Sequence, residues 1–205
     1  MPRLTLTLFS TLLAALLALA ACSPTFNWRE VRPENTRLSL LLPCKPDKAQ
    51  KTVPLGGQTA QLSMLGCDAG GATFAVAVAD MGDAAHTGAA LAQWQSLTLA
   101  NMKAGPVGSG AGATQVLPFK APGLAPGLQA VLVKAQGRRA DGSAVSGQAV
   151  YFVQGAQVFQ VVLYASQVSP EVAETFSPAS SCRPRHDAGL PDFACRYAGA
   201  NRISE

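Results

Sequence analysis

The chain has 205 residues, of which 48% are apolar and 14% are charged, and its formal net charge is +4. This length fits one domain, and an ordinary apolar fraction with so little net charge excludes an intrinsically disordered chain. Five cysteines are too few for a disulfide miniprotein, while 12 Asp and Glu and two His leave few groups for acid–base catalysis or metal binding. We therefore expect a folded protein that is not an enzyme and that holds no cofactor and no metal.

The N-terminal segment has the layout of an export signal. Arg3 supplies a positive charge, and residues 4–21 (LTLTLFSTLLAALLALAA) then contain no ionisable group. A run of this length is also near the lower limit for a membrane-spanning helix, so a permanent anchor is the alternative. The end of the run favours a signal peptide over residues 1–21.

Leu19-Ala20-Ala21-Cys22 resembles the bacterial lipobox. The resemblance implies that the mature chain begins at Cys22, whose sulfur carries diacylglycerol, with further acyl attachment at its amino group. Two or three acyl chains give stable membrane attachment without a spanning helix. Ser23 follows the cysteine, and by the same resemblance it favours the outer membrane, facing the periplasm. An ordinary signal peptide cut after Ala18-Leu19-Ala20 is the alternative.

The other four cysteines are Cys44, Cys67, Cys182 and Cys195. An even number in an oxidising compartment predicts two disulfides, although four cysteines allow three pairings. Sequence proximity favours Cys44 with Cys67, which would link adjacent strands, and Cys182 with Cys195, which would pin the C-terminal tail over residues 182–205. Cys182, His186 and Cys195 could instead ligate a metal, but three ligands in an exported chain make this the weaker hypothesis.

The first part of the mature chain is predicted to be extended. Residues 22–35 read as a lipidated tether, and residues 36–42 alternate leucines on one face, which predicts a strand ending at Pro43. Residues 48–55 and 58–67 flank Gly56-Gly57 and predict a β-hairpin. Residues 72–81 (ATFAVAVADM) then predict a strand with Phe74, Val76 and Val78 on one face and alanines on the other, a surface that a helix can cover closely.

A helix is expected over residues 87–104. Ala90, Leu91, Trp94, Leu97 and Thr98 form its apolar stripe, Thr87 is the candidate N-cap, and Gly105-Pro106 ends it. Residues 104–127 are so rich in Gly and Pro that only a short strand at 116–119 is expected there. So long a loop is either mobile or a binding surface.

Residues 128–166 predict a three-stranded antiparallel meander. Asp141-Gly142 joins residues 128–139 to 144–154, and Gly155 passes the chain into residues 157–165 (QVFQVVLYA). Because this last segment is apolar on both faces, we expect it in the middle of a sheet covered by helices. Ser169-Pro170-Glu171 predicts a closing helix with Phe176 on its buried side.

The order of these elements resembles the photosystem extrinsic protein PsbP and the bacterial envelope proteins that share its fold. The resemblance lies in the opening strand ending at Pro43 and Pro46 (LSLLLPCKPD), the mid-chain helix, the hairpin before QVFQVVLYA and the closing helix with Phe176. It implies an α+β domain over residues 36–181, with an antiparallel sheet of six to seven strands and helical cover. A fold of this kind implies no activity.

Few side chains are candidates for a binding site. Asp80, Asp83 and His86 form the chain's one local cluster of carboxylates and imidazole, and the main alternative is a solvated connection with Asp83 near the positive end of the helix. Trp94 is predicted to be the helix's core anchor and to border any cleft beside it. Arg138-Arg139 and Arg183-x-Arg185 could each bind an anionic group, but solvated hairpin and tail residues are the favoured interpretation.

Three function classes are compatible with these features. The first and favoured one is a non-catalytic, membrane-anchored envelope lipoprotein that binds a protein partner or another envelope component through its Gly/Pro-rich loop or a face of its sheet. The second is a periplasmic carrier of a small molecule or ion, which requires a concave pocket near Trp94. The third is an enzyme built on Asp80, Asp83 and His86, which requires those side chains to converge beside a cavity. An exported protein does not meet nucleic acid, so we expect no nucleic-acid partner.

Overall fold

The computed structural model describes residues 25–110, 112–120, 130–168, 176, 183–185 and 192–194. Seven strands of this part of the chain form one sheet in the order β3-β4-β5-β9-β8-β7-β6, and every neighbouring pair is antiparallel. The strands are β3 (Asp47–Leu55), β4 (Gln58–Ala69), β5 (Ala72–Asp80), β6 (Gln115–Phe119), β7 (Ala130–Arg138), β8 (Ala144–Gln154) and β9 (Gln157–Ala165). The antiparallel sheet predicted from the sequence is confirmed.

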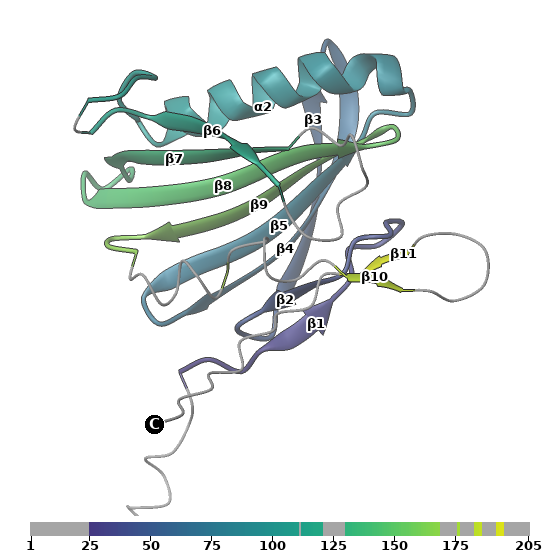
Figure 1. Ribbon diagram of the computed structural model, residues 1–205, viewed down its shortest axis with the longest axis horizontal. Coiled ribbons are helices and arrows are strands. Elements are labelled where there is room, and N and C mark those ends of the chain that lie inside the picture. The colour runs from purple at the N-terminus through teal and green to yellow at the C-terminus, as the bar shows by residue number, and fades with distance from the viewer. Residues whose placement is uncertain are drawn as a thin grey trace, which may run out of the picture.

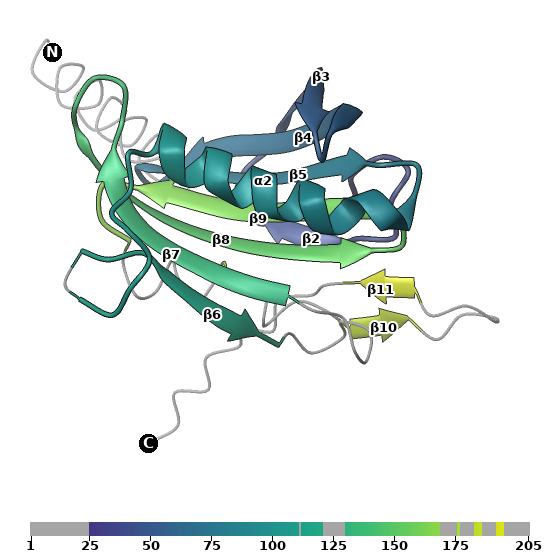
Figure 2. The ribbon, with the colours of Figure 1, turned by 90° about the horizontal axis from the view of Figure 1, so that it is seen from above.

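One face of the sheet is covered by a helix. The 3₁₀ turn η1 (Ala84–His86) leads into α2 (Thr87–Asn101), which lies along the sheet in Figures 1 and 2. Beneath the helix Ala77 and Ala79 of β5 are buried, Ala79 fully so, and they share a core with Ala90 and Trp94. The small-residue face of residues 72–81 was predicted to lie under this helix, and that prediction is confirmed.

Three details of the predicted helix are wrong. It ends at Asn101 instead of residue 104, and Lys103 already has a positive φ of 50°. Thr87 does not cap it: Thr87 is the first helical residue and its hydroxyl donates to the Ala84 carbonyl at 2.7 Å, while Asp83 caps η1 by accepting from the Ala85 amide. Leu97 is 47% exposed instead of buried. A helix turns about 100° per residue, so a face centred on Trp94 and Thr98 leaves Leu97 at its margin.

The opposite face of the sheet packs on the beginning of the chain. A two-stranded ribbon, β1 (Arg29–Val31) and β2 (Leu40–Leu42), lies there (Figure 2). Leu38, Leu40 and Leu42 are buried as predicted and contribute to a core with Phe74 and Phe159. The ribbon contradicts one expectation, because residues 29–31 were assigned to the tether and instead pair with β2.

The first predicted strand, residues 36–42, is shorter than expected because a turn occupies its beginning. The Thr36 hydroxyl donates to the Pro33 carbonyl at 2.9 Å and accepts from the Leu38 amide at 3.3 Å. These bonds hold the backbone out of the ladder, and β2 begins only at Leu40. Side-chain competition of this kind is typical of Thr beside a turn.

Strand β9 is central, as its two apolar faces predicted. It pairs with β5 on one side and β8 on the other. Val158 and Phe159, which point to opposite faces, are both fully buried. Helix α2 covers one face, but the other is covered within the described residues by the β1–β2 ribbon and by Phe176, which meets Phe74 edge-on at 4.8 Å between ring centroids. The closing helix expected before Phe176 lies outside the described residues.

The disulfide predicted between Cys44 and Cys67 is present, with 5.9 Å between the two Cα atoms. Cys67 lies in β4, and Cys44 follows β2 and directly precedes the Asp47↔Gly66 end of the β3–β4 ladder. The bond therefore ties the β1–β2 ribbon to the main sheet. Cys22, Cys182 and Cys195 lie outside the described residues, as do the signal segment and His186.

Candidate functional site

A cavity of about 500 Å³ lies between the C-terminal half of α2 and the sheet. Its volume is in the range of small-molecule sites, and apolar and aromatic side chains dominate its wall. The helix contributes Trp94, Thr98, Asn101 and Met102; the sheet contributes Met64, Thr73, Ala75, Ala77, Val145, Gln160, Val162 and Tyr164; and the end of β7 contributes Arg138 and Arg139.

The register of the sheet explains why space remains under the helix. Several residues facing α2 are small: Ala75 pairs with Gly66 on one side, and in the neighbouring strands Ala135 pairs with Gly147. On a pleated sheet alternate residues share a face, so these positions lie beside larger ones such as Val162 and Tyr164 of β9. The helix packs closely where Ala90 and Trp94 are buried, and space remains beside the small residues.

The helix is held at both ends. Near its beginning the Gly56 amide donates to the Gln93 side chain at 2.7 Å, and Gly56 lies directly against Ala90. Gly56 and Gly57 both have positive φ, 62° and 81°, which the tight β3–β4 turn requires.

At the other end the Arg138 amide donates to the Met102 carbonyl at 2.7 Å. Gly137 and Gly147 leave room there for Met102, because a Cβ on Gly137 would overlap the Met102 carbonyl oxygen. The two attachments fix the height of α2 above the sheet, so the cavity is a built feature of the fold.

A hydrogen-bonded polar group closes the inner end of the cavity. The Gln160 side-chain amide donates to the Tyr151 hydroxyl at 2.7 Å and to the Thr98 hydroxyl at 3.0 Å, and the Thr98 hydroxyl donates to the Trp94 carbonyl. Gln160 is only 6% exposed. Burial raises the pKa of Tyr151, an effect that its hydrogen bonds to Thr98 and Gln160 oppose. These groups are neutral at physiological pH, so the inner end offers hydrogen bonds without charge.

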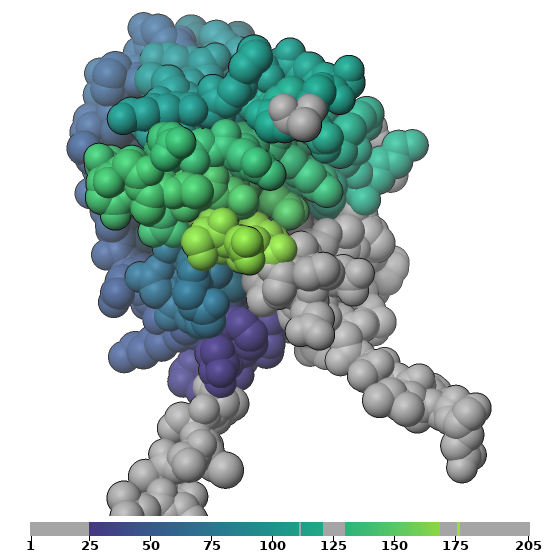
Figure 3. Space-filling model, turned by 90° about the vertical axis from the view of Figure 1, so that its left-hand side faces the viewer, coloured from purple at the N-terminus to yellow at the C-terminus, as the bar shows by residue number. Residues whose placement is uncertain are grey.

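The outer end of the cavity is positively charged. Three cross-strand pairs of β5 and β9 follow one another from the inner to the outer end of the cavity: Ala77–Gln160, Ala75–Val162 and Thr73–Tyr164. The β7–β8 connection lies at this end; it is the green segment in Figure 3, next to the teal chain that follows α2. Arg138 and Arg139 stand there, exposed, and no Asp or Glu is among the described lining residues.

The cluster of Asp80, Asp83 and His86 lies in the connection between β5 and α2 and not at the cavity. Asp80 accepts from the Gly82 amide at 2.9 Å, Asp83 accepts from the Ala85 amide at 2.9 Å, and His86 precedes α2, with all three exposed. Both carboxylates thus stabilise the connection between β5 and the helix, and none of the three lines the cavity at Trp94. No group of three or more His, Cys, Asp or Glu in the described ranges could hold a metal ion.

Of Asp80, Asp83, His86 and Trp94, only Trp94 lies at the cavity. It is 8% exposed and packs in the core beneath α2, as predicted. The sequence analysis considered Arg138 and Arg139 only as neighbours in a hairpin. Nothing in the sequence alone shows that these arginines and Trp94 line the same cavity.

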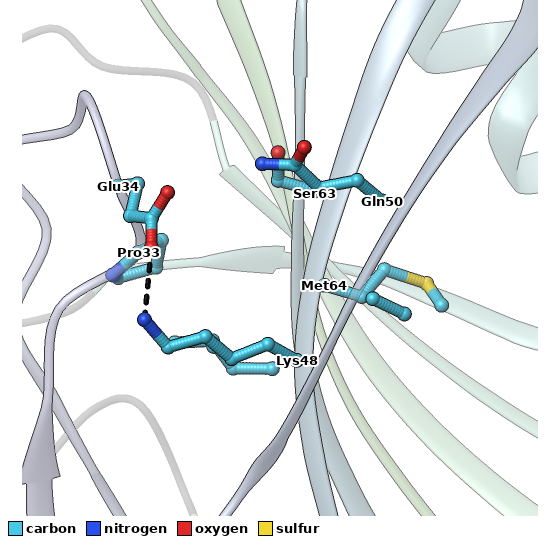
Figure 4. A pocket seen from close by; sticks show the side chains of 8 residues that line it. Pro33, Glu34, Lys48, Gln50, Ser63 and Met64 are labelled. Carbon is cyan, nitrogen blue, oxygen red and sulfur yellow. Dashed lines mark hydrogen bonds and ion pairs between the residues drawn. The ribbon is translucent and has the colours of Figure 1, made fainter.

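A second, smaller hollow lies near the edge of the sheet, between residues 33–34 and strands β3 and β4. Figure 4 shows Glu34 and Lys48 pointing toward each other, and the Lys48 Nζ lies 2.8 Å from the Glu34 carboxylate. The hydrogen bond and the charge of Lys48 hold the pKa of Glu34 below its usual value. The volume of this hollow, about 30 Å³, has room for little more than a water molecule. We therefore interpret the Glu34–Lys48 pair as a link between the ribbon and β3 and not as a ligand site.

Among the helices of the described residues, none has the length and hydropathy needed to cross a bilayer. Comparison with known proteins gave little. No protein-family model and no curated protein matches the chain. One similar solved structure is a protein of unknown function, PA94 from Pseudomonas aeruginosa, described as a putative regulator; it is 15% identical, with a TM-score of 0.30 over 75% of this chain and 90% of that one. A likeness this low carries no argument about fold or function.

Proposed function

We propose that the protein is a membrane-anchored envelope lipoprotein that binds a small molecule without chemical turnover, in the cavity between α2 and the sheet. The observation that carries the proposal is the cavity itself: about 500 Å³, walled mainly by apolar groups, with a buried hydrogen-bonding end at Gln160. Small-molecule sites combine an apolar wall with a few placed polar groups in this way. The carrier hypothesis required a pocket beside Trp94, and this cavity meets the requirement.

The anchoring and location belong to the same proposal. Lipid attached at Cys22 would hold the domain at the outer membrane, facing the periplasm, where a disulfide such as Cys44–Cys67 persists. A relation to PsbP-like envelope proteins is proposed on the order of elements alone. Docking of an envelope protein partner remains the alternative function, through the Gly-rich loop before β6 or the exposed Val116 and Leu117 of this edge strand.

Binding can be tested with N-phenyl-1-naphthylamine, a neutral apolar dye whose fluorescence rises on leaving water. The chain from residue 22 onward would carry Cys22→Ser, so that no lipid occupies the cavity, and would be exported so that its disulfides form. We expect saturable binding that Ala75→Leu weakens at least tenfold, because the larger side chain fills the cavity.

Ala92→Leu is the matched control, since Ala92 lies on the exposed side of α2. It adds the same atoms outside the cavity and should leave dye binding unchanged. Absence of saturable binding, or equal binding by both variants, would overturn the proposal.

A further inference from the structure

The two arginines at the mouth of the cavity give it a charge preference. Arg138 and Arg139 are its charged lining residues within the described chain, both are cationic, and the rest of the lining is neutral. Arginine is always protonated at physiological pH and presents several N–H donors to a carboxylate or phosphate. A ligand with an anionic end is therefore the one that complements this mouth.

The local contacts of the arginines leave them able to bind. Arg138 donates one N–H to the Gly142 carbonyl at 3.0 Å, and a guanidinium has five N–H groups. The nearest carboxylate along the chain, Asp141, accepts from the Ser143 hydroxyl at 2.6 Å and from the Ser143 amide at 2.9 Å; these bonds, and to a smaller extent the charge of Arg139, lower its pKa. Neither arginine makes an ion pair with a described Asp or Glu.

The interior sets the rest of the ligand. Between the arginines and the Gln160 end, the wall is made mainly of apolar side chains (Met64, Ala75, Val145, Val162 and Trp94), with the polar groups of Thr73, Asn101 and Tyr164 among them. Ala77 and Thr73 lie four residues apart along β5, so this wall is about 13 Å long at the rise of a β-strand. An apolar chain or ring suits such a wall, because it brings no polar group that needs a partner there.

From this arrangement we propose that the ligand is an amphipathic organic anion, whose apolar body lies under α2 and whose carboxylate or phosphate meets Arg138 and Arg139. The inference rests on the proposed function and specifies its ligand class. The lining residues then have two roles. Trp94 and the small residues of the sheet contact the apolar body of the ligand, and the arginines select its charge.

The test compares three ten-carbon chains that displace N-phenyl-1-naphthylamine, each below its micelle concentration: decanoate, decanol and decyltrimethylammonium. Decanoate should bind at least tenfold more tightly than decanol, and decyltrimethylammonium more weakly than both. The advantage of decanoate should shrink with added salt, because the arginines are exposed and their charges are screened.

Arg138→Gln with Arg139→Gln should remove most of the advantage of decanoate over decanol, and a urea unfolding curve like that of the parent protein shows that the variant is folded. Arg37→Gln with Lys45→Gln is the control, since it removes the same charge from exposed positions around β2, on the other side of the sheet. It should leave all three affinities as they are.

The outcomes separate this inference from the proposed function. If the dye binds and decanoate has no advantage over decanol, or if the two double variants behave alike, the anionic ligand class is wrong while the binding function stands. If neither the dye nor any of the three chains binds, both are wrong.

Discussion

At the scale of single residues, Trp94 and His86 are a contrasting pair. Trp94 is buried beneath α2, whereas His86 precedes the helix, is exposed and makes no side-chain capping bond. Trp94→Ala should lower the free energy of unfolding by about 3 kcal/mol, through lost burial and an enlarged cavity. His86→Ala should change it by less than about 0.5 kcal/mol.

Thermal or urea unfolding of both variants measures this contrast. A larger loss for His86→Ala, or destabilisation of the parent protein by a metal chelator, would mean that Asp80, Asp83 and His86 form a genuine site.

Tyr164 provides a pH-dependent test of the cavity wall. Burial, and secondarily Tyr151, raise its pKa from 10.0 to about 12. Because the folded state keeps the phenol protonated more strongly than the unfolded state does, the resulting stability is complete below pH 10 and is lost as pH rises through about 12. Urea unfolding should therefore show falling stability over this window. The stability of the Tyr164→Phe variant should fall less over the same window. An identical pH dependence in the two proteins would contradict the burial of the hydroxyl.

At the scale of elements, the attachment of α2 to β7 depends on a glycine. A Cβ on Gly137 would overlap the Met102 carbonyl that accepts from the Arg138 amide, so Gly137→Ala must displace the end of the helix. We expect a loss of about 1–3 kcal/mol in unfolding free energy, together with altered dye binding, since this attachment borders the cavity.

Gly88→Ala is the control for that change. Gly88 lies in the first turn of α2 with nothing within 4 Å of its added Cβ, so Ala should be neutral or stabilise the helix by up to about 1 kcal/mol. Calorimetric melting of the two variants should shift in opposite directions or leave Gly88→Ala unchanged. Similar losses in both would show that the close approach at Gly137 is not what holds the helix.

The two predicted disulfides can be tested together. Cys44–Cys67 is present, and the small hairpin of β10 (Arg183–Arg185) and β11 (Asp192–Ala194) supports the second predicted pair. Its register pairs Arg183 with Ala194, which are the neighbours in sequence of Cys182 and Cys195. Nonreducing peptide mapping of the exported protein should recover both pairs. A peptide joining Cys44 to either tail cysteine, or free thiols at Cys182 and Cys195, would refute the second pairing.

Elements set by local signals were predictable, and those set by distant pairing were not. Gly56-Gly57 and Gly155 mark the turns of their hairpins, and the alanine face of β5 identified the place of α2. By contrast, β1 has only three residues, too few for a recognisable hydrophobic pattern. It is a strand because it pairs with β2. The cavity arises because separate strands bring small residues to one face, so it could be anticipated only as a cleft beside Trp94.

At the scale of the whole molecule, Arg138 and Arg139 and the lipidation motif concern the same question, namely what the domain meets at the membrane. In the proposed function the sulfur of Cys22 would carry diacylglycerol, and the ligand proposed for the cavity is an amphipathic anion, a class that includes membrane lipids. Two acyl chains hold a protein at a bilayer stably, at about 0.8 kcal/mol per buried methylene, whereas one chain holds it only marginally.

Cys22→Ala should therefore abolish incorporation of radiolabelled fatty acid and release of the signal segment at that position, because the atom that accepts the lipid is gone. Ser23→Ala, one position later, keeps the thiol and should be labelled like the parent protein. Separating the membranes of labelled cells then tests the location, with the parent protein expected in the outer membrane. Label retained by Cys22→Ala would overturn the lipoprotein assignment but leave the cavity and its ligand class standing, since those depend only on residues from Met64 to Tyr164.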